Sequence, residues 1–491
     1  MAAAGIYLLA ILLTAAIVHC SSFPTSFSLE RRHSPLSQLR ELDTYRNRRS
    51  LASNGDIFFA LKGQYEPPAI GLYYTKLRIG SPPREYYVQL DTGSDVVWIS
   101  CTSCVGCPTK SDLGITVNKY DPGTSTTSGL LPCWDNLCST ATESGDAFCC
   151  ARTALCGYAL QYANSGNSAY GYYVSDMLHM YEATDTAVTT QSISTPIVFG
   201  CTAMLNIRNG TNITKVVGGM LGLGPRNMSF ISQLANRGVI PRVFSHCLRG
   251  DADTSDNGGG LLVLGEITAP RLIYTPLVQS TSQYKLDLQS ISVDGKTLAI
   301  DRSVFKTTET QGTIVDSGTT LAYLADGAYD VVMEAITEIV LKSAISYPNN
   351  IYKCFLPGAR ADLIFPQVLL HFAGGAIMVL NPDNYLTKQT TLAGEVRCIG
   401  FDNIPGQKVS ILGDIILKDK LVVYDMENNR FGWSDYNCSV AAEVSSTVNK
   451  VVNQKGPKNM SSPKNVPCKL ITMAIIGLLL QLFTSSSYLF L

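Results

Sequence analysis

From Gly71 onward the hydrophobic positions fall in short runs rich in Val, Ile, Leu, Tyr and Thr, which Gly, Pro, Asn or Asp interrupts every several residues. Runs of this length, ended by turn-forming residues, predict β-strands in an all-β architecture. Clear examples cover 72–79, 85–90, 96–100, 197–200, 261–264 and 420–425. Apolar residues recur at near-helical spacing in only a few places, and we expect short helices at 229–237 and 326–343.

One short motif occurs in both halves of the chain. In each copy apolar residues precede an Asp, and a hydroxyl residue, Gly and a second hydroxyl residue follow it; the copies cover 88–94 and 313–319. Each copy is followed later by two apolar residues and Gly, at 220–222 and 411–413. The interval is longer in the first half, and the Cys-rich stretch from Cys101 to Cys156 matches the surplus. The repeat therefore predicts two related β-lobes, with that stretch as an insertion in the first.

The repeated motif also supplies candidate catalytic residues. Asp91 and Asp316 would each stand at the end of a buried strand, followed by a tight turn. Gly allows the close backbone approach that such a turn needs, and its N–H can point at the carboxylate. The second hydroxyl residue has the offset needed to hydrogen-bond the outer carboxylate oxygen. The residues expected to support the two carboxylates are Thr92, Gly93 and Ser94 in the first turn, and Ser317, Gly318 and Thr319 in the second.

A single Asp-Ser/Thr-Gly sequence is usually no more than a turn. Two copies with matched apolar-apolar-Gly partners go beyond that explanation, and across a pseudo-twofold axis their carboxylates would share one site. Like charges so close cannot both ionise, so one proton is held between the two groups. Such a pair can take a proton from water while giving one to a peptide carbonyl, with no metal and no cofactor. The sequence thus predicts peptide-bond hydrolysis at acidic pH through Asp91 and Asp316.

Length and composition agree with this interpretation. A chain of 491 residues is too long for one ordinary core and long enough for two. The formal net charge of -1 gives no electrostatic reason to expect nucleic acid as a partner. Only five His residues are present, and neither a Gly-x-Ser-x-Gly nor a His-Glu-x-x-His string occurs. Serine, His-triad and zinc hydrolysis are therefore disfavoured.

Both ends of the chain carry candidate targeting signals. The apolar run 5–18 has the length of a signal-peptide core, although a membrane-anchoring first helix is the alternative. The Arg-rich stretch 31–51 after it indicates a propeptide whose positive charges would meet an acidic cleft. At the far end, the apolar run 470–483 has no charged residue after it and follows a polar spacer and small residues near Ser461. This predicts a glycosylphosphatidylinositol (GPI) anchor, with a single membrane span as the alternative.

Fifteen Cys residues behind a secretory leader predict a disulfide framework. Cys101, Cys104 and Cys107 could instead belong to a zinc ribbon, but no second pair with CxxC spacing follows. Five Asn-x-Ser/Thr sequons agree with the secretory route and are candidate glycosylation sites, at Asn209, Asn212, Asn227, Asn437 and Asn459.

By its two Asp turns, its Ile-Leu-Gly-Asp at 411–414 and its Val-Tyr-Asp at 423–425, the chain resembles the pepsin-like aspartic proteases. It is most similar to the plant nepenthesin-like branch, which has a Cys-rich insertion in its first lobe. The resemblance runs from about Gly71 to Cys438. It implies a flap hairpin whose Tyr lies over the catalytic cleft, and it identifies Tyr162 as that Tyr and Trp98 as its hydrogen-bond partner.

The resemblance also implies six cystine pairs. Because Cys149 and Cys150 are adjacent, which of them pairs is left open. The implied pairs are Cys101–Cys104, Cys107–Cys201, Cys133–Cys156, Cys138 with Cys149 or Cys150, Cys247–Cys438 and Cys354–Cys398.

Together these observations predict a bilobal, all-β, pepsin-like aspartic endopeptidase that acts on peptides or proteins, as a monomer. A pepsin-fold binding or inhibitor protein without catalysis is the alternative. The expected parts are a signal peptide (1–22), a propeptide (23–70), an N-terminal catalytic lobe (71–270) with its insertion (101–156), a C-terminal catalytic lobe (271–438), a polar stalk (439–468) and a GPI-anchor signal (469–491). We expect the enzyme on the outer face of the plasma membrane.

Overall fold

The computed structural model describes residues 57–439, apart from 67–69, 112–114, 151–153, 163–166, 184–189, 207–217, 251–258, 268, 270, 280–281, 350–351, 358–363 and 393. These described residues belong to one compact unit. Most of its regular elements are strands, as the sequence predicts. Among the described residues, no helix has the length and apolar character needed to cross a lipid bilayer.

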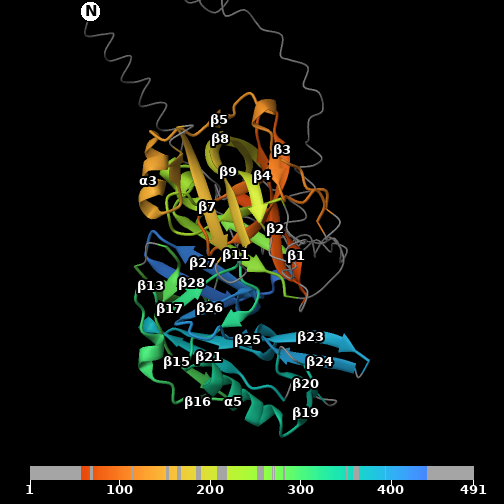
Figure 1. Ribbon diagram of the computed structural model, residues 1–491. Helices are drawn as coiled ribbons and strands as arrows, with labels where there is room; N and C mark the ends of the chain where they lie inside the picture. Colours follow the sequence, from red (N-terminus) through yellow and green to blue (C-terminus); the bar gives the residue numbers. More distant parts are fainter. Residues whose placement is uncertain are drawn as a thin grey trace, which may run out of the picture. The chain divides into compact units, whose positions relative to one another are not determined.

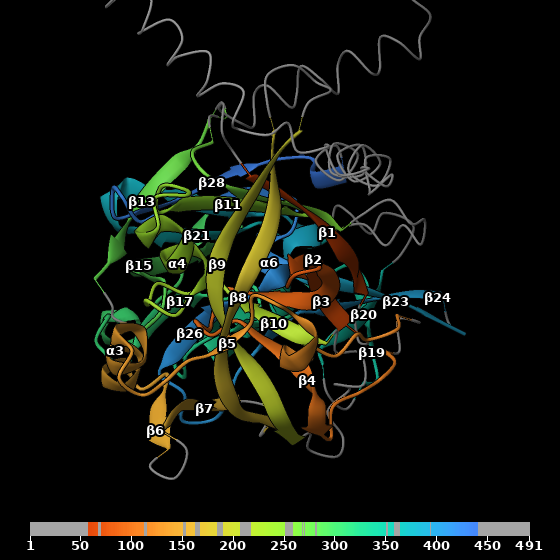
Figure 2. The ribbon, with the colours of Figure 1, turned by 90° about the horizontal axis from the view of Figure 1, so that it is seen from above.

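The N-terminal lobe is a set of connected strands (orange to green in Figure 1). They are β1 (Ile57–Glu66), β2 (Ile70–Ile79), β3 (Arg84–Asp91), β4 (Trp98–Val105), β5 (Gly129–Leu130), β6 (Phe148–Cys150), β7 (Leu155–Tyr162), β8 (Asn167–Ala183), β9 (Thr190–Asn206), β10 (Gly219–Gly222), β11 (Val243–Leu248) and β12 (Gly260–Leu264). Two helices accompany them, α3 (Asn136–Ser144) and α4 (Phe230–Asn236). Figure 2 shows the long, twisted hairpin that β8 and β9 form.

The C-terminal lobe (green to blue) contains β13 (Ile273–Val278), β14 (Lys285–Leu286), β15 (Leu288–Val293), β16 (Lys296–Thr297), β17 (Gly312–Val315), β18 (Ala322–Tyr323), β19 (Ala344–Tyr347), β20 (Cys354–Pro357), β21 (Val368–Phe372), β22 (Ile377–Leu380), β23 (Leu386–Thr391), β24 (Gly394–Ile399), β25 (Phe401–Asp402), β26 (Val409–Leu412), β27 (Lys420–Asp425) and β28 (Arg430–Asp435). Its helices are α5 (Tyr329–Val340) and α6 (Asp414–Leu417). Short 3₁₀ turns cover Pro122–Thr124, Arg302–Phe305, Ala373–Gly375 and Pro382–Asn384.

Two of the helices are the ones that the sequence predicts. Ser229 caps α4, because its side chain accepts a hydrogen bond from the backbone N–H of Ser232. The apolar side chains of α5 at Val332, Met333, Ile336 and Val340 are buried, in keeping with their near-helical spacing. Helix α3 lies in the Cys-rich insertion and was not expected from the sequence.

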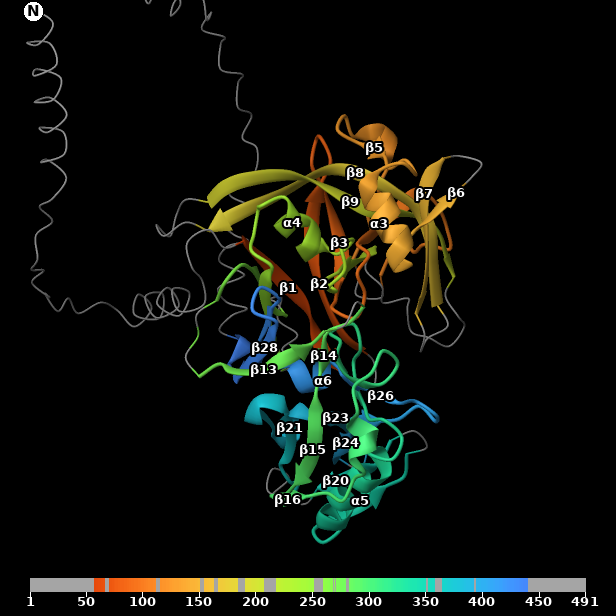
Figure 3. The same cartoon turned by 90° about the vertical axis from the view of Figure 1, so that its left-hand side faces the viewer.

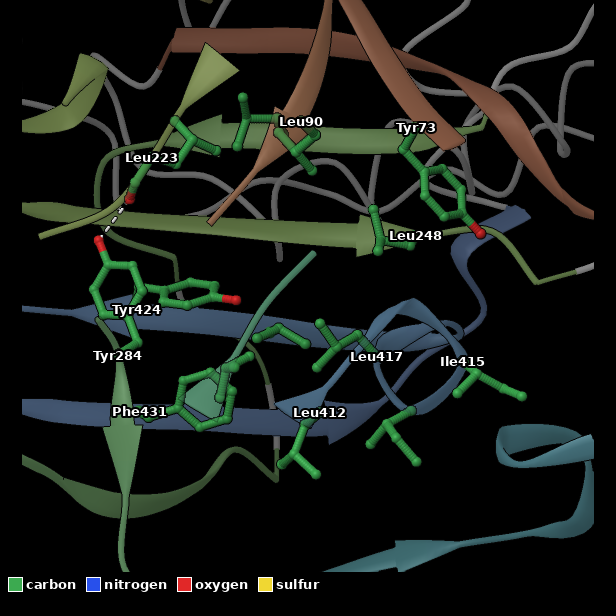
Figure 4. Packing of buried hydrophobic residues seen from close by; sticks show 14 of the residues in the cluster. Tyr73, Leu90, Leu223, Leu248, Tyr284, Leu412, Ile415, Leu417, Tyr424 and Phe431 are labelled. Carbon is green, nitrogen blue, oxygen red and sulfur yellow. Dashed lines mark hydrogen bonds between the residues drawn. The ribbon is translucent and has the colours of Figure 1, made fainter. Parts of the chain in front are cut away.

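A shared sheet joins the lobes. Antiparallel pairing runs from β1 through β12, β11, β27 and β28 to β13, so that β11 of the N-terminal lobe is hydrogen-bonded directly to β27 of the C-terminal lobe. Large buried side chains from both strands meet here, and the Phe244 and Tyr424 rings stack with their centroids 4.4 Å apart. This shared core fixes the two lobes against each other (Figure 4).

The same local topology occurs in each lobe around its Asp motif. Strand β3, which ends at Asp91, runs parallel to β10, with Asp91 opposite Gly222. Strand β17, which ends just before Asp316, runs parallel to β26, with Val315 opposite Leu412. The apolar-apolar-Gly segments are thus the parallel partners of the two Asp strands. This is the repeat that the sequence predicts.

Strand β1 lies inside segment 23–70, which the sequence predicts to be the propeptide. The strand pairs with β2 and β12, and its Ile57, Phe59 and Leu61 side chains are buried in the core. Cleavage at residue 70 would therefore remove part of the folded lobe.

The structure corrects the cystine pairs that the resemblance implies within the insertion. It contains Cys101–Cys201, Cys104–Cys107, Cys133–Cys149 and Cys138–Cys156 in place of Cys101–Cys104, Cys107–Cys201, Cys133–Cys156 and Cys138 with Cys149 or Cys150. The sheet gives the physical reason for the first of these bridges: β4 runs parallel to β9 with Ile99 opposite Cys201, so that Cys101, two residues further along β4, lies near Cys201. The expected pairs Cys247–Cys438 and Cys354–Cys398 are both present.

Candidate active site

Each motif Asp is held by its own turn. Asp91 Oδ1 accepts the backbone N–H of Gly93 at 2.9 Å, and its Oδ2 accepts the Ser94 hydroxyl. Asp316 Oδ1 accepts the backbone N–H of Gly318 at 2.8 Å, and its Oδ2 accepts the Thr319 hydroxyl at 2.6 Å. Both carboxyl groups therefore have the same partners in the same order, and these are the partners that the motif predicts.

The two turns face each other closely. A Cβ atom built at Gly93 would lie 2.5 Å from Asp316 Cγ, and one built at Gly318 would lie 2.5 Å from Asp91 Oδ1. Any side chain at either position would strike the opposite carboxyl group, so only Gly fits. The structure thus brings Asp91 and Asp316 into one site.

Hydrogen bonds between the lobes lock the two turns together. The backbone N–H of Ser317 donates to Thr92 Oγ1 at 2.9 Å, and the backbone N–H of Thr92 donates to Ser317 Oγ at 3.2 Å. The hydroxyl of Tyr424 also donates to Thr92 Oγ1, at 3.4 Å. The sequence identifies Thr92 and Ser317 as supporting residues, and the structure shows that each supports the opposite turn.

The electrostatics of the pair favour a shared proton. Burial and the neighbouring Asp316 carboxyl raise the pKa of Asp91 to about 7, although the Ser94 hydroxyl and the Gly93 amide act in the opposite direction. A carboxyl group with such a pKa stays protonated in acid while a close partner carries the charge. The site can therefore offer one proton donor and one proton acceptor at once.

Strands β7 and β8 form the expected hairpin next to this site, with Tyr162 opposite Asn167. The indole Nε1–H of Trp98 donates to the Tyr162 hydroxyl at 2.8 Å, which is the expected contact. Burial of the hydroxyl and the nearby charge of Asp91 raise the pKa of Tyr162. The phenol therefore lies close enough to Asp91 to interact with it. Residues 163–166, between the two strands, lie outside the described residues.

An ion pair behind the first turn, between a half-buried Arg226 and buried carboxyl groups, was not predicted from the sequence. Arg226 donates its backbone N–H to Asp95 Oδ1 at 2.7 Å, and its guanidinium Nη1 donates to Asp146 Oδ1 at 3.0 Å. Asp95 follows the first Asp motif directly, and Asp146 lies in the Cys-rich insertion, after α3. Arg226 therefore connects the catalytic turn to the insertion. The sequence shows an acidic residue, Asp95, directly after Ser94, but no pattern in the sequence identifies Arg226 as its partner.

The insertion is in turn connected to the flap hairpin. The Cys138–Cys156 bridge joins α3 to β7, and the Cys133–Cys149 bridge joins the segment before α3 to β6, which pairs with β7 (Figure 3). The insertion thus supports the strand that ends at Tyr162.

A third carboxyl group lies near the pair. Asp414, in the Ile-Leu-Gly-Asp segment, is fully buried, and its pKa is raised strongly by burial and by the charges of Asp316 and Asp91. Its Oδ1 has no hydrogen-bond partner among the described residues. Asp414 is therefore a third buried carboxyl group beside the pair, and its surroundings disfavour its charged form.

Two of the five predicted glycosylation sites fall within the described residues. Asn227 and Asn437 are both exposed, whereas Asn209, Asn212 and Asn459 lie outside the described part of the chain. Cys438, the middle residue of the Asn437 sequon, is buried in its bridge to Cys247.

Within the described residues, no three His, Cys, Asp or Glu side chains are grouped so that they could hold a metal ion.

Two β-lobes that each contribute an Asp turn to one site define the pepsin-like class of proteins. Family models match both lobes: "Xylanase inhibitor N-terminal" matches residues 73–266, and "Xylanase inhibitor C-terminal" matches residues 283–435. The solved structures of basic 7S globulin from soybean and of conglutin gamma from lupine seeds superpose with a TM-score of 0.60 each, at 18% and 19% identity. They cover 80% and 78% of this chain, and the match spans 100% and 95% of theirs. At this identity they show the fold alone.

Two curated plant proteins have a higher sequence identity to this chain than these solved structures do. Aspartic proteinase 36 of Arabidopsis thaliana is 34% identical over 94% of this chain and 93% of its own length, and Aspartic proteinase 39 of the same plant is 34% identical over 92% and 91%. The chain therefore belongs to the pepsin-like aspartic protease family, and within it to the atypical plant members.

Proposed function

We propose that this protein is an aspartic endopeptidase that hydrolyses peptide bonds in protein substrates at acidic pH. One observation supports this most directly. Both Asp turns are complete, they face each other, and each carboxyl group is held by one backbone N–H and one hydroxyl. A fold kept only for binding would not need two matched carboxyl groups in contact.

In the proposed reaction, a water molecule bound between Asp91 and Asp316 attacks the carbonyl carbon of the scissile peptide bond. The ionised carboxyl takes a proton from the water, and the protonated carboxyl gives its proton to the carbonyl oxygen. The product of this step is a neutral tetrahedral diol. Transfer of a proton to the amide nitrogen then breaks the C–N bond and releases an amine and a carboxylic acid. Thr92 and Ser317 keep the two carboxyl groups at a fixed separation throughout.

The alternative is a pepsin-fold protein that binds or inhibits without catalysis. The names of the two matching family models refer to xylanase inhibitors, which gives this alternative some weight. A binding protein would tolerate loss of either Asp, whereas an enzyme would not. The two functions are therefore separated by substitution at the pair itself.

The test is hydrolysis of a mixed peptide library by purified protein between pH 3 and pH 8. We expect cleavage in acid that a pepstatin-type transition-state mimic blocks, and loss of cleavage in Asp91→Asn and Asp316→Asn. Asp330→Asn, at an exposed position in the first turn of α5, is the matched control and should remain active. Absence of cleavage in the wild type, or activity in both pair variants with an unchanged thermal transition, would contradict the proposal.

We also propose that the enzyme is secreted and held on the outer face of the plasma membrane by a GPI anchor. The support is in the sequence alone: the apolar run 470–483 is followed by no charge and preceded by a polar stretch. Phosphatidylinositol-specific phospholipase C should then release active enzyme from intact cells. Recovery of peptides from beyond Leu470 in the mature, membrane-bound protein would instead indicate a single span.

A further inference from the structure

A buried tyrosine makes a contact between the lobes that no sequence motif identifies. Tyr284 comes immediately before β14, in the C-terminal lobe, and its side chain is 2% exposed. Its hydroxyl donates a hydrogen bond of 2.7 Å to the backbone carbonyl of Leu223, which follows β10 in the N-terminal lobe (Figure 4). The ring packs edge-on against Tyr424, 4.7 Å away between centroids. The position of the hydroxyl is therefore fixed by the packing of its ring.

Both ends of this hydrogen bond are connected to a catalytic turn. The backbone N–H of Leu223 donates to the carbonyl of Asp91 at 2.8 Å. On the other side, the backbone N–H of Val315, the residue before Asp316, donates to the carbonyl of Tyr284 at 3.0 Å. A path of three hydrogen bonds thus runs from the backbone of Asp91 to the strand that carries Asp316.

We propose that Tyr284 is a positioning residue that sets the separation of the Asp91 and Asp316 carboxyl groups. The inference rests on the proposed peptidase function. Thr92 and Ser317 hold the turns together beside the carboxyl groups, whereas Tyr284 holds the strands together behind them. Since the two Asp residues belong to different lobes, contacts between the lobes decide how far apart they lie.

A purely structural role for this hydroxyl would have a different signature. Any buried tyrosine that donates to a carbonyl stabilises the fold, and its loss lowers the melting temperature. If the hydroxyl sets the separation of the two carboxyl groups, its loss increases that separation slightly. The electrostatic repulsion and the proton sharing between the two groups then become weaker. Weaker repulsion lowers the upper apparent pKa of the pair, and weaker proton sharing raises the lower one. The pH profile of kcat should therefore become narrower on both sides.

Tyr284→Phe removes the hydroxyl and keeps the ring, and Tyr385→Phe is its matched control. Tyr385 is also buried, donates to the carbonyl of Pro366 at 2.6 Å and stacks on Phe401. Among the described residues, none of these contacts involves Asp91, Asp316 or their turns. In Tyr284→Phe the Leu223 carbonyl loses the hydroxyl that donates to it. Met426 Sδ, which lies 3.5 Å from that hydroxyl, is an acceptor and cannot take its place as a donor. Both variants should lose similar thermal stability.

We expect only Tyr284→Phe to lower kcat, by ~5-fold, with KM unchanged and with the narrower pH profile described above. Hydrogen exchange provides a measurement that needs no activity: protection of the Leu223 and Val315 amides should fall in Tyr284→Phe and stay unchanged in Tyr385→Phe. A wild-type protein without peptidase activity would overturn the proposed function, and the exchange experiment would still decide whether Tyr284 connects the two turns.

The assignment is overturned if Tyr284→Phe has the kcat and pH profile of Tyr385→Phe, or if the two amides keep their protection. If Tyr284→Phe yields no folded protein, hydrogen exchange at the Leu223 and Val315 amides of the wild type tests whether Tyr284 connects the two turns. A connected path predicts that the Leu223 and Val315 amides open together, with protection factors within about tenfold of each other. Independent opening would contradict it.

Discussion

Thr92 and Ser317 exchange two hydrogen bonds, one in each direction, although 225 residues separate them in the chain. Each residue follows one of the motif Asp residues directly, so each lobe uses its own turn to hold the turn of the other. Both residues are fully buried or nearly so. The arrangement makes the geometry of the two carboxyl groups a property of both lobes together.

Thr92→Val should therefore lower kcat by about 10- to 100-fold, because the buried Ser317 N–H loses its acceptor at a cost of about 1–3 kcal/mol. Thr92→Ser keeps the hydroxyl and should recover most of the activity. Steady-state kinetics and thermal unfolding of both variants provide the check. Equal activity of the two variants would mean that the hydroxyl does not hold the second turn.

The flap can be tested with two tyrosines of the same hairpin. Tyr162→Ala should lower kcat strongly, since the phenol lies near Asp91 and a closed flap excludes water and orients the scissile bond. Tyr170, on β8, pairs with Ala159, three residues from Tyr162 along β7, so its side chain points to the opposite face of the hairpin. Tyr170→Ala is therefore the control. Similar losses of kcat in both variants would show that the assigned flap residue is wrong.

Asp95 should make the protein more stable in acid than at neutral pH. Burial raises its pKa to about 7, and Asp146 adds to this rise, against the effects of the Arg226 amide and guanidinium. In the unfolded chain the pKa of an Asp is about 3.9. The folded state thus binds the proton more tightly. The stability that this group contributes is complete below about pH 4 and is lost as the pH rises to about 7.

The measurement is the melting temperature at several pH values between 4 and 7. The wild type should lose more stability over this range than Asp95→Asn, in which this titration is absent. Asp330→Asn provides the control for a change of one surface charge. If Asp95→Asn shows the same decline as the wild type, the pKa of Asp95 is not raised as described.

The position of β1 leads to a prediction about maturation. Since Ile57, Phe59 and Leu61 are buried in the core and belong to the part of β1 that pairs with β12, we expect the N-terminus of the mature protein to lie before Ile57. N-terminal sequencing of the mature protein isolated from its native source would show this directly. A fully active form that begins at Gly71 or later would contradict it.

The residues that act within one turn could be predicted from the sequence. Asp91, Gly93 and Ser94 are neighbours in the chain, so their spacing already contains the geometry of the carboxyl site. The same holds for the strand that ends at Asp91, because an apolar run before a turn residue is a local signal. The repeat of the Asp motif and of its apolar-apolar-Gly segment predicted two related lobes, whereas the parallel pairing of these segments with the Asp strands is seen only in the structure.

The contacts between distant segments could not be predicted in this way. Tyr284 meets Leu223 and Arg226 meets Asp146 only after the strands have paired, and no local pattern marks either partner. The cystine pairs implied for the insertion were wrong for the same reason. Cys101, Cys104 and Cys107 lie within a few residues of each other, and the register of β4 on β9 favours Cys101 as the partner of Cys201.

The Cys247–Cys438 bridge has a consequence for what happens when a protease cuts this chain. It joins β11, near the end of the N-terminal lobe, to Cys438, which lies shortly beyond the end of β28 at the close of the C-terminal lobe. A single cut anywhere between these two cysteines would therefore produce a two-chain molecule whose pieces remain covalently attached. Such a nicked form would migrate as one species on a non-reducing gel and as two on a reducing gel, and the paired β11 and β27 would keep both catalytic turns in place.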